Sequence, residues 1–190
     1  MSISYIKKMY KEINNCIITL KKGGVILYPT DTIWGIGCDA TNKKAVEKIK
    51  KIKNRQDDKS FIILVNTLSQ LRNITKKDYN IKNDSKKPTT IIYPKVYGIA
   101  NNILANDGSC GIRVVKDIFC QKLIEKFGIP ITSTSANISG KKNPKNFSEI
   151  DIHILNNVDY IVNLRREEFM ENPSRIIKIN NLDNIEIIRE

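Results

Sequence analysis

The chain has 190 residues, of which 41% are hydrophobic and 27% are charged, and this size and composition fit a single domain over residues 1–190. No stretch approaches the roughly 20 apolar residues of a membrane span, and residues 1–22 lack a signal-peptide core, so we expect a cytoplasmic protein without membrane contact. The net charge of +12 attracts anions, but the lysines form scattered doublets, which indicates a generally basic surface rather than a dedicated nucleic-acid groove.

The first half of the chain alternates helical and strand patterns. Apolar residues recur at helical spacing over residues 4–21, and Gly23-Gly24 ends that helix. Capping residues at positions 39–42 precede a second helix with apolar residues three apart. The other elements expected in this half are strands at residues 25–28 and 61–65 and a weaker helix at residues 69–74.

The second half of the chain is richer in strands. Asp117 can cap a helix with Leu123, Ile124 and Phe127 on one face. The lysine-rich stretch 75–87 is expected to be a loop without a domain boundary. The expected strands are residues 89–93, 110–115, 129–132, 158–162, 175–179 and 185–188.

The order of these elements predicts the fold class. Strands and helices alternate irregularly, so we expect an α/β fold with an open mixed sheet and flanking helices. Polar loops follow strand ends at residues 29–37, 54–60 and 133–146. Since ligands bind at such loops in open α/β sheets, the site should be built from these three segments.

Two of the polar segments have both a functional and a structural interpretation. Residues 28–37, with the sequence Tyr-Pro-Thr-Asp-Thr-Ile-Trp-Gly-Ile-Gly, can present hydroxyls and N–H groups to a small polar ligand, or form a turn with an aromatic plug. Residues 133–140, with the sequence Ser-Thr-Ser-Ala-Asn-Ile-Ser-Gly, follow a buried strand and can bind a ligand or cap a helix. Neither interpretation is excluded by the sequence.

Four cationic residues also have both a functional and a structural interpretation. Lys53 and Arg55, with Lys59 close behind, can complement a helix C-terminus or hold a polyphosphate or carboxylate. Arg113 lies among apolar residues of a predicted strand, so it faces water at a sheet edge, a partner or a ligand.

Other site classes are absent from the sequence. The four cysteines (Cys16, Cys38, Cys110 and Cys120) are far apart and His153 is the only histidine, so we expect reduced thiols, no metal site and no Cys/His or Ser/His pair. The phosphate-loop pattern GxxxxGK[ST] is missing, as is a GxGxxG that follows a strand.

Taken together and in order, the segments resemble the YrdC-like family, the threonylcarbamoyl-AMP synthases. The similarity covers nearly the whole chain, and its most specific part is Lys53-x-Arg55 followed by a Ser-x-Asn at residues 135–137. The matching segments are residues 24–37, Asp39-Ala40, Lys53-x-Arg55, Thr89-Thr90, residues 111–114, residues 134–140, Pro173-Ser174 and Ile188-Arg189.

The resemblance implies a twisted, open fold with a concave basic face. It also implies that the protein condenses L-threonine, bicarbonate or CO2, and ATP into threonylcarbamoyl-AMP and pyrophosphate for threonylcarbamoyladenosine modification of tRNA. The resemblance further implies that Lys53 and Arg55 are the catalytic cations. The implied ATP-binding residues are Lys53, Arg55, Ser109, Ser135, Asn137, Asn143 and Arg189, and the implied threonine-binding residues are Thr30, Thr32, Arg113, Ser133 and Ser174.

Three departures from the family pattern fall on the threonine side. Residues 85–88 are Ser-Lys-Lys-Pro where many members have an aromatic-Pro-Gly stretch, Arg175 replaces a common threonine, and Trp34 replaces a frequent tyrosine. The tetrad of Lys53, Arg55, Ser135 and Asn137 is intact. Longer members add a linker and a second domain, and this chain ends before such an extension.

The resemblance also suggests cofactors and partners. Mg²⁺ is expected with the triphosphate, and the expected partners are the proteins that transfer the threonylcarbamoyl group, with a possible weak tRNA contact. The main alternative is a non-catalytic basic RNA-binding module, which the net charge favours and the 7% aromatic content disfavours. A further alternative is the carbamoyl-handling module of hydrogenase maturation, which occurs within much longer chains.

Overall fold

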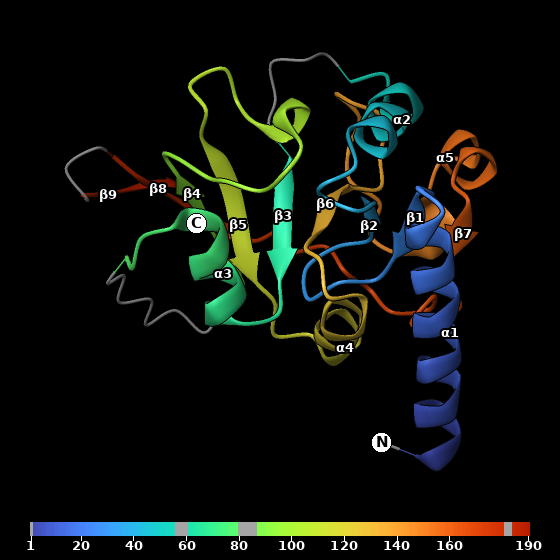
Figure 1. Cartoon of the computed structure of the whole chain (residues 1–190). Coiled ribbons are helices and arrows are strands. Elements are labelled where there is room, and N and C mark those ends of the chain that lie inside the picture. The colour runs from blue at the N-terminus through green and yellow to red at the C-terminus, as the bar shows by residue number, and fades with distance from the viewer. Residues whose placement is uncertain (1, 56–60, 80–86, 181–183) are drawn as a thin grey trace.

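The computed structural model describes residues 2–55, 61–79, 87–180 and 184–190, which form a nine-stranded sheet with helices on both faces (Figure 1). The helices are α1 (Ile3–Lys21), α2 (Lys43–Lys53), α3 (Leu68–Thr75), α4 (Ile118–Phe127) and α5 (Ile152–Asn157), with 3-10 turns at Asn101–Ile103 and Phe147–Glu149. The strands are β1 (Ile26–Tyr28), β2 (Gly35–Gly37), β3 (Ile62–Val65), β4 (Thr89–Tyr93), β5 (Cys110–Val114), β6 (Ile131–Ser135), β7 (Tyr160–Ile161), β8 (Arg175–Ile179) and β9 (Ile185–Arg189).

The sheet is mixed and open, as predicted. Its strand order is β7-β1-β2-β6-β3-β5-β4-β8-β9. The pairs β1–β7, β3–β5 and β4–β8 are parallel and the other neighbours are antiparallel. Strands β3, β5 and β6, which are distant in sequence, therefore become neighbours at the centre of the sheet.

Each face of the sheet buries its own hydrophobic cluster, because successive strand residues point to opposite sides. Leu64 of β3 packs with apolar residues of α1 and α4, and these two helices lie on one face (Figure 1). Its neighbours Ile63 and Val65 pack with residues of α2, α3 and α5 on the other face. We call the side of the sheet on which α1 and α4 pack the α1/α4 face. On this face the two helices cover the strands near β1 and β3, and they leave the part near β4 and β8 without a helix from the described residues.

The helix starts follow from the capping residues in the sequence. Asp117 begins α4 by accepting a hydrogen bond from the backbone N–H of Cys120 at 2.8 Å, which confirms its predicted role. Asn42 begins α2 in the same way through the N–H of Ala45 at 3.1 Å.

Strand β2 corrects the prediction that residues 29–37 form a loop. Glycine has a low strand propensity, so Gly35 and Gly37 conceal the strand in the sequence. A Cβ atom at Gly37 would lie 2.2 Å from the carbonyl oxygen of Thr132 and 2.8 Å from a ring carbon of Tyr28. Glycine is therefore required for β2 to fit between β1 and β6.

Two further expectations need correction. Strand β6 extends through Ser135, so residues 133–135 belong to the strand rather than to the loop that follows it. Helix α5 was not predicted, since its six residues include a histidine and two asparagines. Parts of the predicted loops 54–60 and 75–87, with Lys59, Ser85 and Lys86, lie outside the described residues.

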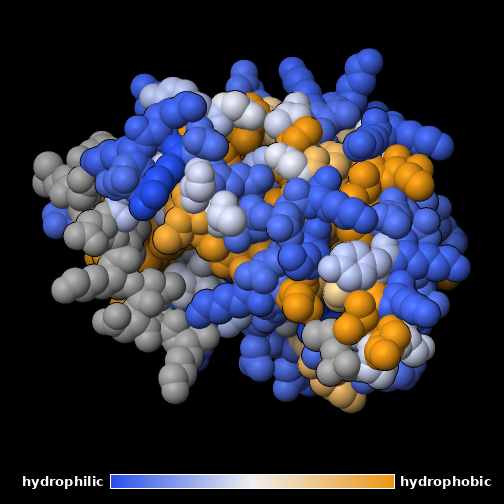
Figure 2. Space-filling view, turned by 60° about the horizontal axis from the view of Figure 1, so that its bottom comes forward, coloured by the Kyte–Doolittle hydropathy of each residue, from blue (hydrophilic) through white to orange (hydrophobic). Residues whose placement is uncertain are grey.

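The thiols agree with the sequence-based expectation. All four cysteines are buried and free. Among the described residues no helix combines the length and the apolar character that crossing a bilayer requires. Figure 2 shows a mostly hydrophilic face on which hydrophobic side chains form separate small patches.

Candidate functional site

A cavity of about 240 Å³ lies where most of the predicted site residues meet, and we call it the central cavity. Strands β3, β5 and β6 contribute its floor, and the segments that precede β2 and β8 contribute its sides. Its described lining residues are Thr32, Ile33, Arg55, Ile62, Arg113, Ser133, Thr134, Ser135, Asn143, Pro173, Ser174 and Arg189.

The floor of this cavity exists because small residues occupy the uncovered part of the α1/α4 face. Alternation along β5 places Arg113 and Gly111 on this face and Ile112 on the opposite one. A Cβ atom at Gly111 would lie 3.1 Å from the γ-methyl of Thr90 and 3.6 Å from Ile62. The glycine thus brings three strands close together beneath the cavity.

Arg113 is a buried cation rather than a residue exposed at a sheet edge. It is 3% exposed and lies on β5, between β3 and β4. One Nη atom lies 3.1 Å from Oδ1 of Asp31, and the same atom donates a hydrogen bond to Oγ1 of Thr32 at 3.3 Å. The guanidinium therefore faces a partner and the cavity, so the alternative of edge exposure is wrong.

The segment before β2 forms the aromatic plug that was one of its two interpretations, and its ligand-binding role stays a prediction. Trp34 is fully buried and packs against Phe147 with ring centroids 5.2 Å apart, so an aromatic plug is present. The hydroxyl of Thr30 donates to the carbonyl of Ile33 at 2.8 Å and lies 2.9 Å from the hydroxyl of Thr32. Because the proton of Thr30 is already used, Thr32 donates to Thr30 and accepts from Arg113, which fixes the orientation of its hydroxyl.

Ser174 and Arg189 line the opposite side of the cavity, and Thr90 contacts Ser174 without lining the cavity itself. The hydroxyls of Thr90 and Ser174 are 2.8 Å apart. Arg189 donates to the carbonyl of Ser174 from Nη2 at 2.6 Å and from Nε at 3.0 Å. Burial, and secondarily the charge of Arg113, lower the pKa of the Arg189 guanidinium. Two cations therefore approach each other here, as in a receptor for an anion.

Thr90 and Asp31 are the site residues that the sequence did not assign. In the sequence, Thr90 belongs to a segment that matches the family and Asp31 is an acid within a polar segment, but neither residue has a predicted role. The β4–β5 register, in which Ile91 is opposite Ile112, places Thr90 opposite Arg113 on the same face. The sequence of either strand alone does not show that register. For Asp31, the position of an acid between two threonines could have indicated a site residue.

The tetrad of Lys53, Arg55, Ser135 and Asn137 is assembled, but its members have different surroundings. Lys53 is 2% exposed, and its ammonium donates to the carbonyl of Ser135, to the carbonyl of Asn137 at 2.5 Å and to Oδ1 of Asn137 at 3.2 Å. Burial and the charge of Arg55 lower the pKa of Lys53 to about 7. Neither Lys53 nor Asn137 lines the central cavity.

Arg55 is the tetrad cation that lines the central cavity. Asn54 ends α2 in the left-handed conformation, with φ of 50°, and so turns the chain out of the helix just before Arg55. Its Nη1 donates to Oγ1 of Thr134 at 3.1 Å, and its guanidinium lies 4.6 Å from the ring centroid of Phe61. The arginine is thus held from two sides next to Ser135.

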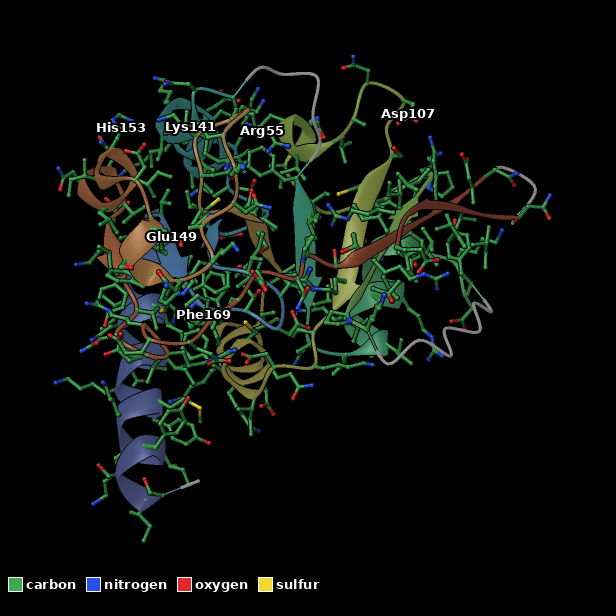
Figure 3. All side chains as sticks on the ribbon, turned by 180° about the vertical axis from the view of Figure 1, so that it is seen from behind. Arg55, Asp107, Lys141, Glu149, His153 and Phe169 are labelled. Atoms are coloured by element: carbon green, nitrogen blue, oxygen red, sulfur yellow. The ribbon has the colours of Figure 1, made fainter. Side chains whose placement is uncertain are left out.

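Ser109 and Thr30 are predicted residues that do not line the central cavity. Ser109 precedes β5 at the end remote from Arg113, about 13 Å away along the strand. Its neighbour Asp107 lies far from Arg55 in Figure 3. Thr30 lines a second cavity of about 560 Å³, the adjoining cavity, which shares Thr32 and Pro173 with the central one.

The electrostatics of the central cavity favour an anionic ligand. Its described lining contains three arginines, Arg55, Arg113 and Arg189, and no acidic side chain. In the described part of the chain no group of three histidines, cysteines or carboxylates is placed to hold a metal ion. A separate cavity of about 420 Å³ beside α3 contains none of the predicted site residues.

Comparison with known proteins adds independent information. The family model for the Sua5/YciO/YrdC domain, described as telomere recombination, matches residues 19–190. A protein of Methanocaldococcus jannaschii with the provisional name threonylcarbamoyl-AMP synthase is 37% identical over 177 residues, which cover 88% of this chain and 80% of that protein. The threonylcarbamoyl-AMP synthase of Wigglesworthia glossinidia brevipalpis is 33% identical and covers 97% of both chains.

A solved structure agrees with the fold. YciO of Escherichia coli superposes with a TM-score of 0.80 at 28% identity, and the match covers 94% of this chain and 88% of that protein. The open mixed sheet described above is therefore an arrangement that a related sequence also adopts.

Proposed function

Because the chain belongs to the Sua5/YciO/YrdC family, we propose that it is an enzyme, a threonylcarbamoyl-AMP synthase, that serves threonylcarbamoyladenosine modification of tRNA. Its substrates are L-threonine, bicarbonate or CO2, and ATP, and its products are threonylcarbamoyl-AMP and pyrophosphate. The observation that carries the proposal is the central cavity, in which three arginines and several hydroxyls meet.

The reaction needs no nucleophile from the protein. The amine of threonine captures CO2 to give a carbamate, and a carbamate oxygen then attacks the α-phosphorus of ATP as pyrophosphate leaves. Burial raises the pKa of Cys38 and of Cys110 to about 12, so their thiols stay protonated near neutral pH. Catalysis would then depend on positioning the substrates and on neutralising negative charge.

The two ends of the central cavity suit different substrates. Arg113, held by Asp31 and Thr32, is placed to bind the carboxylate of threonine, with Ser174 and Arg189 opposite. In this proposal Arg55 and Ser135, which line the other end, bind phosphate oxygens of ATP. This division keeps the amino acid and the nucleotide next to each other, as the second step requires.

Lys53 would act through the turn after β6 rather than on the phosphates directly. Its three hydrogen bonds hold the backbone of Ser135 and Asn137, and Ser135 in turn donates to Oδ1 of Asn137 at 2.5 Å. A lysine at this position therefore orients the hydroxyl that lines the cavity. Contact between Lys53 and the nucleotide would require this turn to open.

The remaining parts of the proposal concern ions, partners and location. Mg²⁺ would enter as a partner of the triphosphate, held largely through phosphate oxygens and water. We propose that the protein acts in the cytoplasm and passes its product to the threonylcarbamoyl-transfer proteins. A concave basic face, the nucleotide roles of Ser109 and Asn143, and a weak tRNA contact stay predictions of the family resemblance.

One assay tests the proposed function. Purified protein is incubated with ATP, bicarbonate and one amino acid at a time, and pyrophosphate release and the acyl-adenylate are followed by mass spectrometry. We expect a product with threonine that is lost when bicarbonate is omitted. Salt-dependent RNA binding without any ATP turnover would contradict the proposal and favour the RNA-binding alternative.

A further inference from the structure

We propose that Asp31 binds the ammonium group of the amino-acid substrate, so that Asp31 and Arg113 together recognise the zwitterion. This inference rests on the proposed function and specifies its amino-acid subsite. The carboxylate of Asp31 and the guanidinium of Arg113 are a pair of opposite charges, which is the complement of a free amino acid.

The first support is that the pair is buried and incompletely satisfied. The side chains of Arg113 and Asp31 are 3% and 9% exposed, and their charged groups lie 3.1 Å apart. Oδ1 of Asp31 and Nε of Arg113 are both buried without a hydrogen-bond partner in the described part of the protein. Oδ1 of Asp31 thus has the ion pair with Arg113 as its contact and Nε of Arg113 has no acceptor among the described residues, so both atoms can still form a hydrogen bond with a ligand that carries both groups.

The second support is the charge around the pair. An ammonium group near Arg113 and Arg189 would be repelled unless a carboxylate lies within contact distance. The described lining of the central cavity supplies none. Asp31 lines the adjoining cavity, and its neighbour Thr32 lines both cavities, so the carboxylate of Asp31 lies next to the central cavity without lining it.

The third support is that Asp31 has few other partners. Apart from Arg113, its partner among the described residues is the backbone N–H of Lys116, at a long 3.3 Å from Oδ2. A carboxylate with only a structural role is normally held by short hydrogen bonds. Asp39 shows this, because its Oδ1 accepts from both the N–H and the hydroxyl of Thr41 at 2.7 Å.

A purely positional role for Asp31 makes a different prediction. If Asp31 only orients Arg113, its loss would weaken every ligand that carries a carboxylate. If Asp31 contacts the ammonium, its loss would weaken only ligands that carry an amine. L-Threonine and (R)-3-hydroxybutanoate separate the two cases, because they share a carboxylate and a hydroxyl and differ in the ammonium group.

The experiment measures binding of both ligands by calorimetry to the wild-type protein, to Asp31→Asn and to Glu125→Gln. Glu125 is an exposed residue of α4, so its variant controls for the same change in net charge. We expect threonine to bind the wild type and the control at least tenfold more tightly than the hydroxy acid. In Asp31→Asn we expect the two affinities to agree within about threefold, through weaker binding of threonine.

Three results would overturn the inference: a threonine preference that persists in folded Asp31→Asn, equal weakening of both ligands, or loss of both. If Asp31→Asn does not fold, Asp31→Ser is compared in the same way. Failure of the proposed function has a separate signature, since the wild type would then bind no threonine and release no pyrophosphate.

Discussion

The two cationic ends of the central cavity are built on different principles. At one end Arg113 and Arg189 point toward the cavity, and Arg113 keeps an unused donor. At the other end the ammonium of Lys53 is already satisfied by carbonyl oxygens, and only Arg55 of that pair lines the cavity. A cation at a site can therefore act in two ways: it can face the ligand, or it can hold the loop that faces the ligand.

The largest expected effect comes from Arg113→Met, which breaks the buried pair at the first end. The uncompensated Asp31 should lower the free energy of unfolding by about 3–5 kcal/mol, and threonine-dependent synthesis should fall by about 10²–10³. Urea unfolding and pyrophosphate release measure the two effects. Arg72→Met, at an exposed arginine of α3, is the control and should change neither.

The double variant Arg113→Met/Asp31→Asn sharpens this prediction. It should regain a large part of the lost stability, because no buried charge is left without a partner, yet stay inactive. A double variant that is no more stable than Arg113→Met would show that the pair is not the source of the cost.

Lys53→Met probes the other end through the pH dependence of stability. The pKa of Lys53 is about 7 in the folded protein against 10.5 in the unfolded chain, so above pH 7 the unfolded state binds more protons and stability rises with pH. Between pH 7 and pH 9 the wild type should gain about 2 kcal/mol relative to Lys53→Met. Lys51→Met, at an exposed position of α2, should keep the wild-type pH profile.

Arg55→Ala should separate binding from folding. We expect the KM for ATP to rise about 10–100-fold, since a charge-assisted contact to phosphate is lost. Stability should change by about 1 kcal/mol, the scale of the contacts that Arg55 makes with described residues, which include a hydrogen bond to Thr134 and a contact with Phe61. An unchanged KM for ATP would contradict the assignment of this end to the nucleotide.

Thr90→Val should have the smallest effect. It removes the hydroxyl that lies 2.8 Å from Ser174, which should raise the KM for threonine about fivefold, equivalent to about 1 kcal/mol. Thr90→Ser retains the hydroxyl and should restore the KM. Steady-state kinetics with varied threonine provide the measurement, and equal behaviour of the two variants would exclude a role for the hydroxyl.

The comparison of the two ends also shows what the sequence could predict. Capping residues and apolar periodicity located α1, α2 and α4, because these signals are local. The ordered family segments located most of the residues that line the central cavity. The pairing of Arg113 with Asp31 was not predictable, since it depends on how two segments distant in sequence meet.

The corrections have physical causes of the same kind. Strand β2 was missed because its glycines serve the close approach of β1 and β6, which overrides strand propensity. The direct role of Lys53 toward the nucleotide stays a prediction, because a motif does not show which way a side chain points. In the folded protein Lys53 is 2% exposed and contacts the turn after β6.

The crossed kinetics of Arg113→Lys and Arg55→Lys test the central claim most directly. If the cavity holds threonine at one end and ATP at the other, Arg113→Lys should raise the KM for threonine at least tenfold and leave the KM for ATP within about twofold. Arg55→Lys should do the reverse. If each variant changes both constants equally, or neither variant changes either, the division of the cavity between the two substrates is wrong.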